Sequence, residues 1–185
     1  MLYKVLQKRR SVRTFEPRAV EPEKLERIFQ AALLSPSSKG IKPWSFILVD
    51  DPALLTTLSN CKPHGAAFLA NAAFAIVVCA DLEVATAWIE DCSIAAINAQ
   101  IAMEEEGLGS CWIQIRGRKT QDGKPSTEYV KKTLTIPDRL EVEAIIAAGY
   151  PAETQIPHSL EDLKWERVHH NNFGKKLTLP GNNSA

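Results

Sequence analysis

Hydrophobic positions recur along the chain at two spacings, and each spacing predicts a different element. Apolar residues at intervals of three and four predict helices at residues 2–9, 22–33, 52–59, 81–106 and 126–133, with a short Ala-rich helix leading to Asn71. Continuous or alternating apolar runs predict strands at 44–51, 74–80, 110–116 and 142–150, and a short one in S-V-R-T-F at 11–15. The chain is therefore predicted to mix helices and strands along most of its length.

Two of these elements are apolar on more than one side. Phe74 to Ala80 is an unbroken apolar run, which is typical of a strand covered on both faces and predicts a central strand. The helix expected at 81–106 has two apolar faces, one made of Ala85, Trp88, Ile89, Cys92, Ala95, Ala99 and Ala102, the other of Ile94, Ile97 and Ile101. Because a helix that is apolar on two sides must be covered on both, we expect its second face to meet another subunit.

The length of the chain and the sparse apolar residues near its C-terminus indicate how its domains are organised. A chain of 185 residues has the size of one domain with a single core, so we expect residues 1–185 to form one domain. After Pro151 the prolines become frequent and the apolar pattern thins, although W-E-R-V-H and L-T-L-P keep some apolar side chains. A tail that cannot form its own core is expected to pack on a partner subunit.

Composition and charge exclude several classes of protein. The apolar share of 45% and the charged share of 24% are those of a globular protein rather than a disordered or fibrous one. Lys plus Arg equals Asp plus Glu at 22 each, so the chain lacks the net positive charge that general binding to nucleic acids requires. The longest apolar stretch, 72–80, is too short to span a bilayer, and no apolar run precedes the N-terminal basic residues. We therefore expect a cytoplasmic protein with no nucleic-acid or membrane partner.

Cysteine and histidine spacing gives no sign of a metal site. Cys61, Cys79, Cys92 and Cys111 form no C-x-x-C pair and are expected to be reduced core residues, and the histidines lack a neighbouring ligand pattern. The chain also lacks G-x-G-x-x-G, a phosphate loop ending in G-K-S/T, G-x-S-x-G and H-E-x-x-H. An enzyme with this sequence would need a cofactor that brings its own chemistry.

Three stretches could form a binding site, and each also has a purely structural interpretation. In K-R-R-S-V-R at 8–13, guanidinium groups and the Ser11 hydroxyl could bind a phosphate, or the cluster could be the solvated face of a helix. S-P-S-S-K-G-I-K-P-W at 35–44 could bring its backbone close to a ligand, or simply end a helix. In G-L-G-S-C-W-I-Q-I at 107–115, Trp112 could stack on an aromatic ligand or belong to the core.

Taken in order, these stretches resemble the FMN-dependent nitroreductase family. R-R-S-V-R-x-F, S-P-S-S-x-x-x-x-P-W-x-F, G-L-G-S-C-W-I and A-A-G-Y-P follow that family's order and spacing over roughly residues 4–174. The resemblance implies an α+β fold with a mostly antiparallel central sheet wrapped by helices. It also implies a homodimer with one FMN in each of two clefts at the subunit interface.

The resemblance assigns the phosphate end of the flavin to the first motif. Arg9, Arg10 and Ser11 would hold the ribityl phosphate, and Gly149 would lie at the same end. Arg13 would lie either on the phosphate or at the pyrimidine edge of the ring, where a cation stabilises negative charge on the reduced flavin.

The resemblance assigns the ring end to the other two motifs. The P-S-S stretch would come from the other subunit and line the ring; its residues are Pro36, Ser37 and Ser38, followed by Gly40 and Lys42. Beside the isoalloxazine, with backbone amides near its reactive nitrogen, would lie Trp112, Ile113, Gln114 and Ile115.

The chain departs from the family pattern in three places. Gly40 and Lys42 stand where the family loop often has amides, and Lys42 could supply a charge instead. The segment after G-Y-P lacks the usual basic residue, apart from His158. Residues 80–88 leave no room for the inserted segment that roofs the pocket of larger members, so we expect a more open cleft or a roof made by the 116–125 loop.

The activity that the resemblance implies is an NAD(P)H-dependent flavin oxidoreductase. NADH or NADPH would pass a hydride to the flavin and leave, and a nitroaromatic or quinone acceptor would then take its place, in a ping-pong mechanism without a catalytic side chain. Other flavin chemistry on the same scaffold stays open, namely dehalogenation, flavin breakdown or heterocycle dehydrogenation, as does a flavin-binding sensor without turnover.

Overall fold

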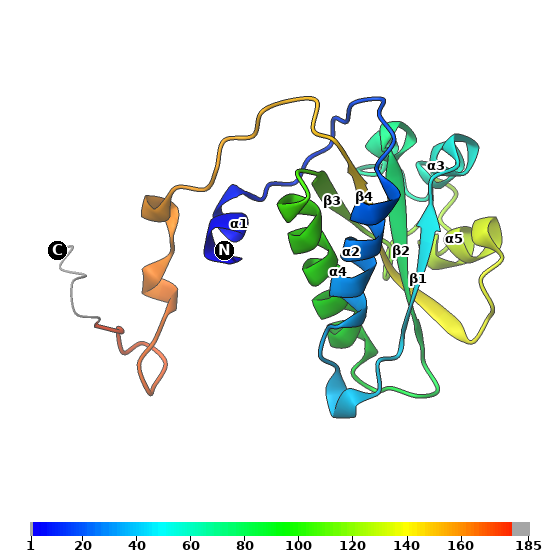
Figure 1. Cartoon of the computed structure of the whole chain (residues 1–185). Helices are drawn as coiled ribbons and strands as arrows, with labels where there is room; N and C mark the ends of the chain where they lie inside the picture. Colours follow the sequence, from blue (N-terminus) through cyan, green and yellow to red (C-terminus); the bar gives the residue numbers. More distant parts are fainter. Residues whose placement is uncertain (1, 179–185) are drawn as a thin grey trace.

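The computed structural model of the chain describes residues 2–178, and its centre is an antiparallel sheet (Figure 1). The strands are β1 (Trp44–Val49), β2 (Phe74–Asp81), β3 (Gly109–Gln114) and β4 (Leu140–Gly149), in the order β1-β2-β4-β3. Every neighbouring pair is antiparallel. The prediction of an antiparallel sheet with 74–80 as an inner strand is confirmed, and β3 lies at one edge.

Helices and short 3-10 turns connect these strands. The α-helices are α1 (Leu2–Lys8), α2 (Pro22–Leu33), α3 (Pro52–Leu58), α4 (Trp88–Glu105) and α5 (Ser126–Leu134). The 3-10 helices are η1 (Ser38–Gly40), η2 (Ala67–Asn71), η3 (Leu160–Asp162) and η4 (Trp165–Arg167). Within residues 2–178, no helix combines the length and the apolar character needed to cross a membrane.

Two predicted elements differ from the structure. The long helix begins at Trp88 rather than at residue 81, because the Asp81 carboxylate accepts a hydrogen bond from the Glu83 amide at 3.0 Å and holds a turn there. S-V-R-T-F does not form a strand. It makes only isolated bridges, between Ser11 and Ser110 and between Phe15 and Pro151.

The sheet is covered on both faces, which explains the unbroken apolar runs in β2 and β4. The helices α2 and α4 pack on one face, against Phe74, Ile76 and Val78 of β2. On the other face, α3, η2 and α5 cover Ala75 and Val77. Since alternate side chains of a strand point to opposite faces, a strand buried on both must be apolar throughout.

The N-terminal helix and residues 152–178 lie outside this body. Figure 1 shows α1 and residues 152–178, here called the C-terminal arm, extending together away from the sheet. The arm is tied to α1 by backbone and side-chain bonds between Gln7 and His158. No residue of α1 is buried, and Ile156 and Phe173 of the arm are 81% and 95% exposed.

Candidate functional site

The basic segment (residues 8–13) leaves the end of α1 and runs along the edge of β3. The Val12 amide donates to the Ser110 carbonyl at 3.0 Å, and Ser11 forms a parallel bridge with Ser110. This approach requires a glycine at 109, because a Cβ there would come within 2.6 Å of Val12 Cγ2. The G-L-G-S motif thus docks the R-R-S-V-R motif onto the sheet.

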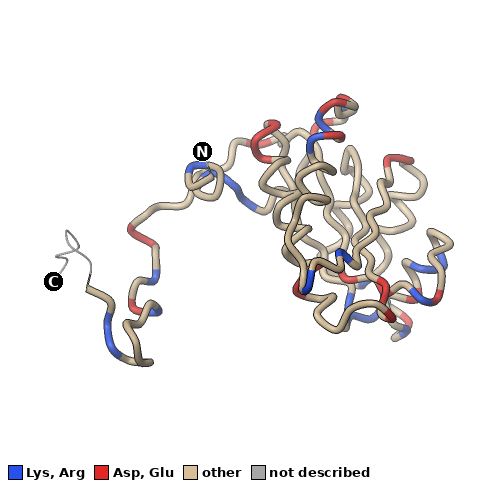
Figure 2. The backbone as a smooth tube through the Cα atoms, turned by 60° about the horizontal axis from the view of Figure 1, so that its bottom comes forward, with Lys and Arg blue, Asp and Glu red and all other residues tan. Residues whose placement is uncertain are grey.

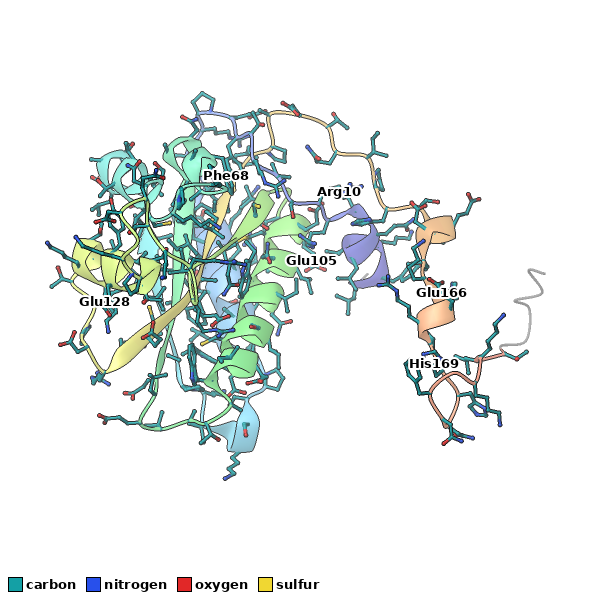
Figure 3. All side chains as sticks on the ribbon, turned by 180° about the vertical axis from the view of Figure 1, so that it is seen from behind. Arg10, Phe68, Glu105, Glu128, Glu166 and His169 are labelled. Atoms are coloured by element: carbon teal, nitrogen blue, oxygen red, sulfur yellow. The ribbon has the colours of Figure 1, made fainter. Side chains whose placement is uncertain are left out.

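Because the basic segment is extended beyond Lys8, its side chains alternate between two sides. Lys8, Arg10 and Val12 line a hollow of about 410 Å³ that also contains several carboxylates. Lys8 Nζ lies 3.0 Å from Glu104 Oε1, and Arg10 Nη1 donates to the Ile156 carbonyl at 2.7 Å. Figure 3 shows Arg10 at the junction of α1 with the body. These two cations are therefore engaged by the protein itself.

The other side of the segment carries Arg9, Ser11 and Arg13 and faces Cys111. Burial raises the pKa of the Cys111 thiol, and the nearby positive charges of Arg13 and Arg9 partly oppose that rise. Arg13 Nη1 donates to the Ser11 carbonyl at 3.3 Å, and the Arg13 guanidinium lies 5.9 Å from the ring centre of Phe68, on η2 (Figure 3). This side thus presents guanidinium and hydroxyl groups together.

Two further cations, Lys62 and Arg118, lie in stretches that meet at Ser126, whose Oγ donates to the Cys61 carbonyl and whose amide donates to the Arg118 carbonyl; the sequence did not identify them as site residues. Burial lowers the pKa of Lys62, and the charge of Arg118 acts in the same direction. The charge of Lys62 in turn opposes the rise in the pKa of the Cys111 thiol. Both residues lie in stretches with turn composition, C-K-P-H-G and R-G-R-K, where nothing in the sequence places them near residues 9–13. Arg118 belongs to the 116–125 loop that was expected to roof the cleft.

These cations have no counter-ion in the described part of the chain. Arg9, Arg13, Lys62 and Arg118 are absent from the ion pairs formed within residues 2–178. Figure 2 shows Lys and Arg positions along the N-terminal segment and others spread over the body and the C-terminal arm. Like charges held together without a carboxylate create a local positive potential that favours an anion, and guanidinium with hydroxyl suits a phosphate. Within the described residues, no group of His, Cys, Asp and Glu is arranged to hold a metal ion.

The edge of β3 continues from this cationic side towards the middle of the sheet. Ile113 and Ile115 are fully buried, and the Ile115 amide donates to the Glu143 carbonyl of β4. Backbone groups alternate between the two sides of a strand, and Ser110 already points outwards to Val12, so the amides of Trp112 and Gln114 also point outwards. The half-buried indole of Trp112 donates to Gln114 Oε1 at 2.9 Å. A ligand along this edge would therefore meet residues 112 and 114.

Gly149 has a packing role in the structure. It is buried at the end of β4, where a Cβ would come within 3.1 Å of both Ala73 and Phe15. The close approach of Phe15 anchors the chain just after the basic segment, where the Glu16 amide donates to the Tyr150 carbonyl at 2.9 Å. Gly149 thus lets Phe15, just after the basic segment, pack closely on the end of β4.

The P-S-S loop (residues 35–42) has a strained backbone. Lys39 and Lys42 have φ values of 53° and 52°, in the left-handed region that costs a non-glycine residue about 1–2 kcal/mol. Side chains hold this shape, since Ser37 Oγ accepts from the Lys42 amide at 2.8 Å and Asp91 Oδ1 accepts from the Ser38 amide at 2.7 Å.

The P-S-S loop and the basic segment lie at opposite ends of the sheet within one chain. The loop leads into the start of β1, where Trp44 pairs with Ala80, whereas the basic segment lies at the other end, where Gly109 pairs with Gly149 (Figure 1). A ten-residue strand such as β4 is about 33 Å long. One copy of the chain therefore cannot bring both motifs to the same small ligand.

Comparison with known proteins identifies relatives over nearly the whole chain. A family model described as "Nitroreductase family" matches residues 6–61 and 55–150. An "FMN-dependent Nitroreductase" structure from Clostridium difficile R20291 is 47% identical, covers 91% of this chain and 98% of its own, and has a TM-score of 0.90. A protein of Archaeoglobus fulgidus named "Putative NADH dehydrogenase/NAD(P)H nitroreductase" is 32% identical over 90% of this chain and 95% of its own. A structure of the same name from Bacteroides thetaiotaomicron VPI-5482 is 31% identical, covers 93% and 98%, and has a TM-score of 0.85.

Proposed function

The chain belongs to the nitroreductase family, and from that premise we propose that it is an FMN-dependent oxidoreductase that takes a hydride from NADH or NADPH and reduces nitroaromatic or quinone acceptors. The observation that carries this proposal is the set of cations without counter-ions beside Ser11 and the β3 edge. An anionic cofactor with a planar ring fits that arrangement, because its phosphate needs the cations and its ring can lie along a strand edge with outward amides.

The residues divide between the two ends of the cofactor. We assign Arg9 and Ser11 to the phosphate, because they share one side of the extended segment and stand beside the docked strand. Arg13 lies further along the same side of the segment, and we assign it, together with Lys62, whose charge acts on Cys111 as that of Arg13 does, to the pyrimidine edge of the ring, where positive charge stabilises negative charge on the cofactor. Arg10 is assigned to the C-terminal arm, since its guanidinium donates to Ile156.

A second copy of the chain completes this site in the proposal. The P-S-S loop lies at the far end of the sheet from the basic segment, so the loop of one copy would serve the cofactor of the other. Exposed apolar side chains on α1, α4 and the C-terminal arm support such a homodimer: Leu2, Tyr3, Leu6, Ile94, Ile97, Ile156, Leu163, Trp165 and Phe173. Large apolar side chains left exposed in a single copy are typical of surfaces that a partner covers.

The chemistry needs little from side chains beyond binding and orientation. When bound, FMN supplies hydride chemistry, so that NAD(P)H is oxidised to NAD(P)⁺ and a quinone gains two electrons and two protons. The basic side holds the cofactor, the amides of Trp112 and Gln114 orient the ring, and the open face admits donor and acceptor in turn. We therefore propose a ping-pong mechanism in the cytoplasm, without a catalytic base from the chain.

The test is a visible absorption spectrum followed by steady-state kinetics. We expect a yellow protein, NAD(P)H oxidation faster than with free FMN, and parallel double-reciprocal lines with a quinone as acceptor. Separate titrations with NADH and NADPH under anaerobic conditions identify the donor. A colourless protein that takes up no added FMN would refute the proposal, and a protein that binds FMN without accelerating its reduction would be a sensor instead.

A further inference from the structure

Asp91, in the first turn of α4, is a buried carboxylate that is only partly satisfied. The residue is 2% exposed, and Oδ1 accepts a hydrogen bond from the Ser38 amide at 2.7 Å. Oδ2 is buried as well and has no hydrogen-bond partner within residues 2–178. A buried carboxylate oxygen without a partner is unfavourable, so the bond from the Ser38 amide to Oδ1 is the contact that holds this carboxylate in place.

The same face of α4 makes a second contact with the P-S-S loop. Asn98 lies seven positions after Asp91, and therefore on the same helix face, and its Nδ2 donates to Ser35 Oγ at 2.8 Å. Ser35 is itself buried and donates to the Ala31 carbonyl at 3.2 Å. The α4 helix thus fixes the loop at Ser35 and at Ser38, just before the residues with left-handed backbone.

We propose that Asp91 is a positioning residue for the flavin, which acts by fixing Ser38 so that the P-S-S loop of one copy keeps the shape that contacts the FMN of the other. This inference rests on the proposed function. In this proposal Asp91 does not touch the cofactor itself; it acts from the first turn of α4 through its hydrogen bond to the Ser38 amide. The left-handed conformations of Lys39 and Lys42 are strained, so the loop is expected to change conformation once the bond from the Ser38 amide to Asp91 is removed.

The test compares Asp91→Ala with Asp91→Asn, which keeps an acceptor for the Ser38 amide, and with Glu90→Gln. Glu90 is exposed in the same helical turn, so its change controls for the loss of negative charge near the start of α4. The first readout is amide hydrogen exchange in residues 36–42 of the full-length protein without FMN. The second is the dissociation constant of FMN, measured by quenching of flavin fluorescence.

We expect Asp91→Ala to accelerate exchange in residues 36–42 and to weaken FMN binding, each about tenfold or more, the size of effect that loss of a charge-assisted hydrogen bond gives. Exchange in β2 should stay unchanged. Asp91→Asn should keep most of the wild-type protection in the loop and most of the wild-type FMN affinity, and Glu90→Gln should match the wild type in both. The proposal is wrong if FMN affinity survives in Asp91→Ala, or if exchange in β2 accelerates to the same extent as in the loop. A wild-type protein that binds no FMN would overturn the proposed function instead, while the exchange data would still decide whether Asp91 anchors the loop.

Discussion

The substitution Gly109→Ala tests how the basic segment is held on the sheet. A Cβ at residue 109 would lie 2.6, 2.7 and 2.8 Å from Cγ2, Cβ and Cγ1 of Val12, all well inside ordinary van der Waals contact. Val12 is 3% exposed, so it cannot turn into solvent without leaving the core. The segment must therefore move, and Ser11 and Arg13, on either side of Val12, must move with it.

The size of the effect follows from that contact. Overpacking of this kind costs about 1–3 kcal/mol. For a chain of 185 residues, each kcal/mol lowers Tm by about 2–4 °C, so we expect Tm to fall by about 2–12 °C. Because the same movement displaces the proposed phosphate ligands, the dissociation constant of FMN should rise about tenfold, which corresponds to about 1.4 kcal/mol. Calorimetry measures the first quantity and fluorescence titration the second.

Two further variants make the reasoning refutable. Val12→Gly removes all three contacting atoms, so Gly109→Ala should cost less in that background, with a coupling of about 0.5–3 kcal/mol. Lys132→Ala, at an exposed position of α5 that takes no part in the proposed site, should leave both Tm and FMN affinity close to wild type. Strict additivity in the double variant, or wild-type Tm and FMN affinity in Gly109→Ala, would contradict the proposed docking.

Two other predictions concern the side chains of the basic segment and the Glu21–Tyr150 contact. Replacing Arg9 and Ser11 together by alanine should weaken FMN binding about a hundredfold in equilibrium titrations, because two charge-assisted contacts are lost. Lys8→Ala breaks only a surface ion pair and should change FMN affinity less than about threefold. Equal effects of the two changes would contradict the assignment of Arg9 and Ser11, but not Lys8, to the phosphate. The hydrogen bond from the Tyr150 hydroxyl is the largest of several effects, with Arg18 and Lys24 among the others, that lower the pKa of Glu21 from 4.5 to about 2, so the stability that this carboxylate contributes is present above pH 4.5 and is lost as the pH falls towards 2. The Tm of Tyr150→Phe should thus lie below wild type at pH 7 and approach it over that range in calorimetry, whereas a pH-independent gap would contradict the assignment.

The sequence predicts the strands well because burial on both faces leaves a local signal. β2 and β4 pair along their length inside the sheet, so nearly every residue had to be apolar, and this pattern is visible without knowledge of the fold. The start of α4 could not be predicted in the same way. Residues 81–87 have helical spacing, but the Asp81 side chain holds a local turn and also pairs with Arg139, far along the chain.

The candidate site could be predicted from the sequence even less completely than the start of α4. The motifs were visible in the sequence, but which of their side chains share a side depends on where α1 ends, and helix ends are poorly defined by local pattern. Lys62 and Arg118 come near each other only because folding brings two turn-like stretches together at Ser126. Asp91 was counted simply as part of a helix, since nothing in the sequence reveals that its carboxylate meets the Ser38 amide.

The most direct test of a flavin site shared by two copies is a complementation experiment with differently tagged chains. One chain carries Arg9→Ala, Ser11→Ala and Arg13→Ala, the other has residues 36–38 replaced by glycines, and bound FMN is measured by absorbance in the purified mixed dimer. If the basic side of one copy and the P-S-S loop of the other form each site, the mixed dimer contains one intact site and should bind about one FMN, although neither parent dimer binds any. A mixed dimer that binds no FMN would contradict a site formed by both copies.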